Sequence, residues 1–178
     1  SIKNSNLNID YEIIIVDNDS NDQSIDLIKK QFTKIKLIEN PSNYGFSKAV
    51  NIGVSDAEGE FILILNPDTI LKKDTISELY QTLLNDSNVA VVGGKILDCN
   101  GKFQLSSRRA FPSFLTSLFH IIGLSYLFPK AKLFGRYNYT YKPSNTSHPV
   151  DAVSGACMMF SRKHFNAVGG FDERYFLF

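Results

Sequence analysis

The sequence predicts an α/β protein with a mostly parallel sheet and helices on both faces. Four apolar runs, listed by position, are continuous rather than alternating: 11–16, 35–38, 61–65 and 89–92. Continuous runs are typical of strands that are buried on both faces of a parallel sheet. Stretches with helical spacing of apolar residues separate these runs, and such alternation of strand and helix is typical of α/β folds.

The first half of the chain is a regular succession of these elements. In chain order we expect strand, helix, strand, helix, strand, helix and strand at 11–16, 25–32, 35–38, 47–57, 61–65, 76–83 and 89–92. We expect the four strands to lie in one sheet. Ser47 is a candidate cap for the second helix, because serine oxygens accept hydrogen bonds from the first turn of a helix.

The second half is less regular. It contains extended segments at 95–107, 150–153 and 156–160. It also contains one apolar helix at 114–128, a polar loop at 142–149 and a short final helix at 161–168. Ser161 is placed to cap the final helix, and Gly169-Gly170 to end it. Arg108 and Arg109 follow an extended stretch, where they could reach an anionic phosphate or simply lie on the surface.

Composition excludes some classes of function. A net charge of +1 gives no electrostatic reason to expect nucleic acid as a partner. Cys99 and Cys157 are isolated, which favours free thiols in a reducing compartment. Residues 1–10 are polar and do not resemble a signal peptide. The apolar stretch 114–128 is shorter than the roughly 20 residues that span a bilayer, so we expect a buried or interfacial helix there.

Polar clusters follow two of the first three strands. Asp17 and Asn18 come after one run, and Asn66, Pro67 and Asp68 come after another. Ligands of open parallel sheets bind beyond the carboxyl ends of the strands. The alternative is that these residues only cap helices and form turns. Pro67 fixes its own φ and restricts Asn66, which suits a carboxylate that holds a metal ion.

Five segments, taken in order, carry a resemblance to a known family. They are EIIIVDNDSND at 12–22, NYGFSKAVNIG at 43–53, LILNPDT at 63–69, VSGAC at 153–157 and GGFDE at 169–173. Their order and spacing are similar to family-two glycosyltransferases of the GT-A fold, in particular the bacterial rhamnosyltransferase type. The similarity extends from about Tyr11 to the last residue.

The resemblance implies a nucleotide-sugar site with a divalent cation, Mg²⁺ or Mn²⁺. The residues it assigns to the donor are Asp17, Asn18, Asn43, Gly45, Phe46, Lys48, Asn51, Asn66 and Asp68. Asp68 is the metal ligand, because these cations prefer carboxylate, phosphate and water oxygens. Asn66 replaces the first aspartate of the family's D-x-D motif, so metal binding is expected to depend on the nucleotide.

The resemblance also assigns an acceptor side. Its residues are Gly155, Ala156, Asp172 and Glu173, although the two carboxylates could instead cap the next element. The family's general base is an aspartate that we expect beyond Phe178, with Asp172 and Glu173 as the fallback. A further strand and helix are expected before Tyr11. We therefore interpret the chain as an incomplete domain, 1–178, that by itself transfers little or no sugar.

The predicted function is metal-assisted, inverting transfer of a sugar in polysaccharide biosynthesis. The donor would be dTDP-rhamnose or a UDP-sugar, bound by residues 11–92, and a glycan or lipid-linked acceptor would bind residues 93–178. Two alternatives stay open, a nucleotidyltransferase-like enzyme and a non-catalytic nucleotide-sugar-binding module. The expected location is the cytoplasm, with peripheral association at the inner face of the membrane as a variant.

Overall fold

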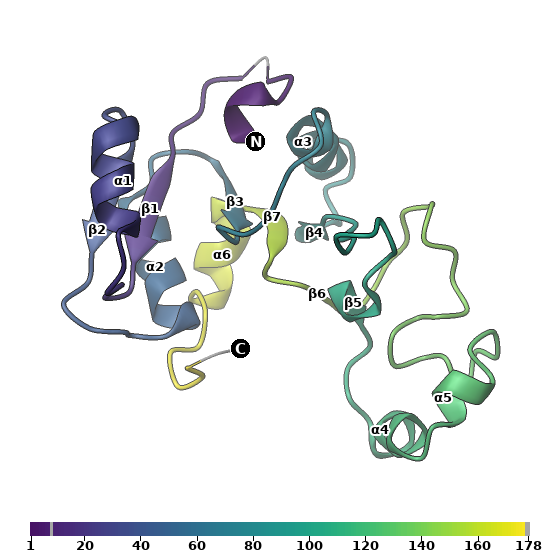
Figure 1. The fold of residues 1–178 in the computed structure, drawn as a ribbon. Coiled ribbons are helices and arrows are strands. Elements are labelled where there is room, and N and C mark those ends of the chain that lie inside the picture. Colours follow the sequence, from purple (N-terminus) through teal and green to yellow (C-terminus); the bar gives the residue numbers. More distant parts are fainter. Residues whose placement is uncertain (8, 177–178) are drawn as a thin grey trace. The chain divides into compact units, whose positions relative to one another are not determined.

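The computed structural model describes residues 1–7 and 9–176 and has the mixed α/β architecture that the sequence predicts (Figure 1). The chain divides into two compact units. Unit 1 comprises Ser1–Ser5 and Leu63–Met159, and unit 2 comprises Asn6–Ile62 and Phe160–Phe178. The boundaries between the units fall within strands β3 (Phe61–Leu65) and β7 (Cys157–Ser161).

Unit 2 is built around a short parallel sheet. Its elements are β1 (Ile14–Asp17), α1 (Ser24–Gln31), β2 (Lys36–Glu39), α2 (Phe46–Asp56) and α6 (Arg162–Val168). Strands β1 and β2 pair in parallel, in register from Ile14 opposite Lys36 to Asp17 opposite Glu39. Helix α2 packs on β1. Gly53 permits this close approach, because a Cβ atom there would lie 3.1 Å from Cγ2 of Val16.

Arg162 closes the C-terminal end of α2. Its guanidinium group donates to the carbonyl oxygens of Val54 (3.1 Å), Gly59 (2.9 Å) and Ala57. Its backbone N–H donates to the carbonyl of Glu60 at 2.8 Å. The last carbonyls of a helix have no partner within the helix, so a cation that binds several of them stabilises the end.

Unit 1 contains the other sheets. Its elements are η1 (Ile2–Asn4), α3 (Thr75–Asn85), β4 (Val91–Gly93), η2 (Leu105–Ser107), β5 (Arg108–Arg109), α4 (Phe114–Ile121), α5 (Leu124–Leu127) and β6 (Ala152–Val153), with most of β3 and β7. The strand order is β3-β7-β4, and β5 pairs antiparallel with β6. The core of this unit is formed by Ile76, Leu79 and Leu83 of α3 and by Met158 and Met159 of β7, all buried.

Two sequence-based expectations require correction. The four apolar runs do not share one sheet in the part of the chain described: β1 and β2 pair with each other, whereas β3 and β4 both flank β7. Strand pairing depends on contacts between distant segments, which local periodicity does not encode. Ser47 does not cap α2 but is buried inside its first turn, with Gly45 preceding the helix. Ser161 does cap α6, accepting a hydrogen bond from the His164 backbone at 3.3 Å.

The first test addresses Arg162. The substitution Arg162→Gln should lower the free energy of unfolding by about 1–3 kcal/mol, because it removes the guanidinium donor from three backbone carbonyls. The matched control is Lys163→Gln, which removes the same charge from the exposed neighbouring residue. Urea unfolding of both variants measures the difference, and equal midpoints would contradict the role given to Arg162.

Candidate functional site

Asn18, the residue after β1, connects the end of β1 with Asn40 and with Gly45 in unit 2. Asn18 donates from Nδ2 to the carbonyl of Gly45 at 3.1 Å, and its Oδ1 accepts from Nδ2 of Asn40 at 2.9 Å. The adjacent Asp17 carboxylate accepts from the Ser20 backbone at 3.0 Å. Both polar atoms of the Asn18 amide are thus used within the protein, which fixes the geometry of the loop after β1.

Gly45 lies where the chain enters α2. Its φ of +82° is in the region that favours glycine, and its N–H donates to Oδ1 of Asn43 at 2.9 Å. The next residue, Phe46, donates its N–H to the carbonyl of Phe176 at 2.8 Å. A Cβ atom on Gly45 would collide with that same carbonyl oxygen. Glycine is therefore required here by both conformation and space.

Asn51 binds the segment that follows α6. Its Nδ2 donates to the carbonyl of Phe171 (2.8 Å) and to Oε1 of Glu173 (3.0 Å), while its Oδ1 accepts from the Phe171 N–H (2.9 Å). The rings of Phe46 and Phe171 meet edge to face at 6.0 Å. Asn51 and Glu173 also line an open depression of about 550 Å³ with Ile38, Ile52, Ser55 and Asp56.

Unit 2 therefore brings together much of the residue set that the sequence predicted. Gathered around α2 and the segment 171–176 are Asn18, Asn43, Gly45, Phe46, Asn51 and Glu173. Lys48 lies with its ammonium 4.2 Å from the ring centre of Tyr44, a cation–π contact. The sequence did not indicate that the amides of Asn18 and Asn51 would bind the protein's own backbone.

The two acidic residues at 172 and 173 differ in their surroundings. Arg174 binds both oxygens of the Asp172 carboxylate, at 2.6 Å for Nη2 and 2.9 Å for Nε. This pairing, with the Arg174 backbone N–H, lowers the pKa of Asp172 to about 2. A carboxylate with so low a pKa is a weak proton acceptor at neutral pH. Glu173 instead accepts from Asn51.

In unit 1, the turn after β3 is bonded to the beginning of β7. The backbone N–H of Asn66 donates to the carbonyl of Ala156 at 3.0 Å, and the Thr69 hydroxyl reaches the same oxygen at 3.4 Å. Thr69 N–H also donates to the carbonyl of Asn66, which closes the turn that carries Asp68. A predicted donor residue, Asn66, thus meets a predicted acceptor-side residue, Ala156. Gly155 and Ala156 are the two residues that precede β7.

Asp68 is the candidate ligand for a divalent cation. Its side chain is exposed, and within the residues described no hydrogen bond or ion pair engages its carboxylate. Among all residues that the structure describes, no three or more His, Cys, Asp or Glu side chains form a group that could hold a metal ion. An exposed carboxylate such as that of Asp68 fits a cation that also takes phosphate and water oxygens, as Mg²⁺ often does.

Arg108 has a role that the sequence did not reveal. It is 8% exposed and donates to the carbonyls of Tyr139 (3.0 Å) and Lys142 (2.9 Å). Nε2 of His148 lies 2.8 Å from its Nη1, and burial lowers the Arg108 pKa. The expectation of a phosphate contact or a surface arginine is wrong for Arg108, which organises a loop. Arg109 is exposed, as expected.

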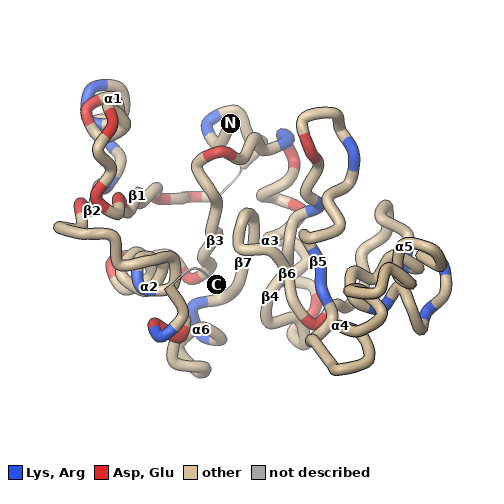
Figure 2. The backbone as a smooth tube through the Cα atoms, turned by 60° about the horizontal axis from the view of Figure 1, so that its bottom comes forward, with Lys and Arg blue, Asp and Glu red and all other residues tan. Residues whose placement is uncertain are grey.

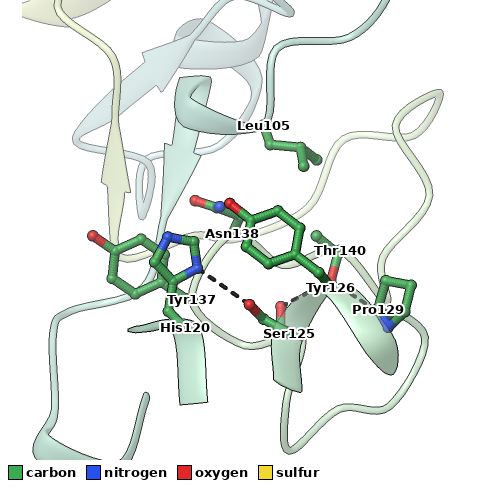
Figure 3. Close-up of a pocket in the computed structure, with 9 residues that line it drawn as sticks. Leu105, His120, Ser125, Tyr126, Pro129, Tyr137, Asn138 and Thr140 are labelled. Carbon is green, nitrogen blue, oxygen red and sulfur yellow. Dashed lines mark hydrogen bonds between the residues drawn. The ribbon is translucent and has the colours of Figure 1, made fainter. Parts of the chain in front are cut away.

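A separate small cavity of about 100 Å³ lies between α4, α5 and residues 135–140 (Figure 3). The rings of His120 and Tyr137 stack at 4.3 Å, and Nδ1 of His120 lies 3.2 Å from the Ser125 hydroxyl. It has room for about three water molecules, which is too small for a nucleotide. None of the predicted site residues lines it.

The two halves of the predicted site belong to different units. Asp17 lies in unit 2, and Asp68 lies in unit 1. That Asp17 and Asp68 contact one ligand therefore stays a prediction.

Comparison with known proteins identifies the fold and the family. The architecture is similar to GT-A glycosyltransferases: a mannosyltransferase, PcManGT from Pyrobaculum calidifontis, solved with GDP-Man and Mn²⁺, aligns with a TM-score of 0.61 at 16% identity, over 97% of this chain and 41% of that one. Residues 1–169 match the family model "Glycosyl transferase family 2". The chain belongs to this family.

Curated relatives agree with this assignment. The low-salt glycan biosynthesis hexosyltransferase Agl10 of Haloferax volcanii is 28% identical over 94% of this chain and 50% of its own length. An N-acetylglucosaminyl-diphospho-decaprenol L-rhamnosyltransferase of Mycobacterium tuberculosis is 26% identical over 93% of this chain and 57% of its own length. The chain thus spans about half the length of these relatives.

Gly45 offers a test with a built-in control. Gly45 and Gly101 both have positive φ (+82° and +77°), but only a Cβ atom at Gly45 meets other atoms, those of Phe176. Gly101→Ala should cost about 1 kcal/mol of stability from backbone conformation alone. Gly45→Ala should cost more and should expose the Phe46 amide to hydrogen exchange, because the Phe176 carbonyl is displaced. Equal effects of the two substitutions would contradict this contact.

Asp172 offers a test by pH. Because its folded pKa of about 2 lies below the ordinary value, the pair with Arg174 stabilises the fold above the ordinary pKa of an aspartate, and this contribution is lost as the pH falls toward 2. NMR titration of the Asp172 carboxyl should show the low pKa. In Arg174→Gln the pKa should return toward about 3.9. An unchanged pKa in this variant would show that Arg174 is not its cause.

Proposed function

We propose that the protein transfers a sugar from a nucleoside-diphosphate sugar to a glycan or lipid-linked acceptor, with inversion at the anomeric carbon. The single observation that carries this proposal is membership of glycosyl transferase family 2 combined with Asp68 on the turn after β3. The bond from Asn66 to Ala156 supports it, because it ties the predicted donor turn to the predicted acceptor-side strand. The proposal concerns the activity of the whole protein, because the chain spans about half the length of its curated relatives.

Asp68 would hold the divalent cation, and Asn66 beside it would bind the donor's ribose or a metal-bound water. The cation, when bound, stabilises the charge that the diphosphate gains as the sugar leaves. The complex of the mannosyltransferase with GDP-Man and Mn²⁺ supports this assignment. Asp17, Asn18 and the segment 43–53 would bind the nucleoside, with Lys48 as a candidate phosphate contact.

The mycobacterial relative suggests which substrates to test first. Its name specifies L-rhamnosyl transfer and a lipid-linked sugar diphosphate. We therefore place dTDP-rhamnose before UDP-sugars as donor, and a prenyl-diphosphate-linked sugar before a free glycan as acceptor. Among the structure's described residues, Glu173 is a better reserve candidate for the general base than Asp172, whose pKa is lowered by Arg174.

Two alternatives differ in their products. A glycosyltransferase releases a nucleoside diphosphate, whereas a nucleotidyltransferase forming a nucleotide sugar releases pyrophosphate. A non-catalytic binding module releases neither. Two incubations of the full-length protein distinguish the three: one with a labelled nucleotide sugar and an acceptor, the other with a labelled nucleoside triphosphate and a sugar 1-phosphate, each followed by separation of the products. NMR of the product shows whether the anomeric configuration is inverted.

Calorimetry tests the metal and donor assignment. The chain should bind dTDP or UDP at least about tenfold more tightly with Mn²⁺ than with EDTA, because Asp68 would hold the cation and the cation would attract the phosphates. Asp68→Asn should remove this difference. Glu78→Gln on α3 is the control, since it removes one exposed carboxylate elsewhere in unit 1. Equal affinities with and without the metal in the unmodified chain would overturn the assignment.

A further inference from the structure

Helices α4 and α5 of unit 1 present an apolar surface to solvent. Phe114 and Ile121 are 81% and 80% exposed, and Leu115, Ile122, Leu127 and Phe128 are also exposed. We call these six residues the α4/α5 apolar face. Large exposed apolar patches are uncommon on proteins that function free in water, and they mark surfaces that contact a partner or a membrane.

Some polar residues of the same helices are buried. Thr116 and Ser125 are only 8% and 9% exposed. His120 lies beside Ser125 and stacks on Tyr137 in the small cavity (Figure 3). Apolar contacts also hold α4 to the rest of unit 1, because the rings of Phe119 and Phe134 meet at 5.0 Å. The residues of the α4/α5 apolar face nevertheless stay exposed to solvent.

Positive charge predominates around this face, where the next acidic residue along the chain is Asp151, whose carboxylate accepts from the Phe111 N–H at 3.0 Å. Residues 99–150 contain no Asp or Glu and have seven Lys or Arg, whereas the rest of the chain has a net charge of −6. Figure 2 shows basic positions without acidic ones beside α5. Lys130 and Lys132, which follow Phe128 directly, and Arg136 are all exposed. No ion pair found in the part of the chain described involves these three residues.

We propose that the α4/α5 apolar face, with Lys130, Lys132 and Arg136, docks on the surface of an anionic phospholipid bilayer. Phenylalanine, leucine and isoleucine side chains would enter the interface, while the cations bind lipid phosphates. Positive charge on a segment without acids is complementary to such a surface. No helix among the described residues has the length and apolarity to cross a bilayer. The surface would therefore lie on the membrane rather than span it.

This inference rests on the proposed function for its purpose, because docking would bring the protein to a lipid-linked acceptor. Its physical basis is independent of that function. Vesicle binding can therefore be measured without nucleotide, metal or turnover, so failure of one proposal is distinguishable from failure of the other.

The test is flotation of the 178-residue chain with phosphatidylcholine vesicles, with and without phosphatidylglycerol. The chain should float with the anionic vesicles, and binding should weaken as salt screens the charges. Lys130→Gln with Lys132→Gln should weaken binding about fivefold per residue. Phe114→Ser with Ile121→Ser should weaken it by about tenfold or more.

Matched variants separate this surface from general effects. Lys72→Gln with Lys73→Gln removes the same charge from exposed positions outside residues 99–150. Val168→Ser removes an apolar side chain that is 78% exposed on α6. These variants should bind like the unmodified chain. Circular dichroism checks that every variant is folded.

Three outcomes would overturn the proposal. The first is no binding to either vesicle, and the second is equal binding by all variants. The third is self-association, seen by light scattering, that Phe114→Ser with Ile121→Ser abolishes while the unmodified chain does not bind vesicles. That result would make a second copy of the chain the occupant of this face.

Discussion

Both ends of α2 are closed by residues from the end of the described chain, and the candidate donor residues of unit 2 depend on this closure. Arg162 binds carbonyls at the C-terminal end, with 108 positions separating it from Val54. At the N-terminal end, the Phe46 N–H binds the Phe176 carbonyl. Between these points, the Asn51 side chain forms two hydrogen bonds with the backbone of Phe171. The first N–H groups and the last carbonyls of a helix have no partner within the helix. The contacts of Phe46 and Arg162 supply such partners at the two ends.

The closure also limits how the donor residues can move. Gly45 has no room for a side chain beside Phe176, and Asn18 is bonded to the Gly45 carbonyl. The loop after β1, the entry to α2 and the segment 171–176 therefore form one connected set. A donor that binds there meets groups already fixed by other parts of the protein, which reduces the ordering that binding requires.

Local sequence signals predicted what is local in this structure. The run 61–65 is strand β3, and Ser161 and Gly169 bound α6 as expected. The motifs also indicated residues such as Asn18, Gly45 and Asn51 that the fold gathers around α2. The sequence could not show that the Asn18 and Asn51 amides bond to the protein itself, because amide partners are set by tertiary contacts. For the same reason it did not distinguish the buried Arg108 from the exposed Arg109, and it did not place β7 between β3 and β4.

The closure of α2 has a consequence for synthesis on the ribosome. Chains emerge from the N-terminus, and contacts between distant residues form only when both partners have been made. Until Arg162 and Phe176 have emerged, α2 lacks the groups that complete its two ends. The nascent chain must therefore carry unit 2 unfinished while all of the intervening residues of unit 1 are translated. Throughout that interval, chaperones have access to a helix that the finished protein covers at both ends.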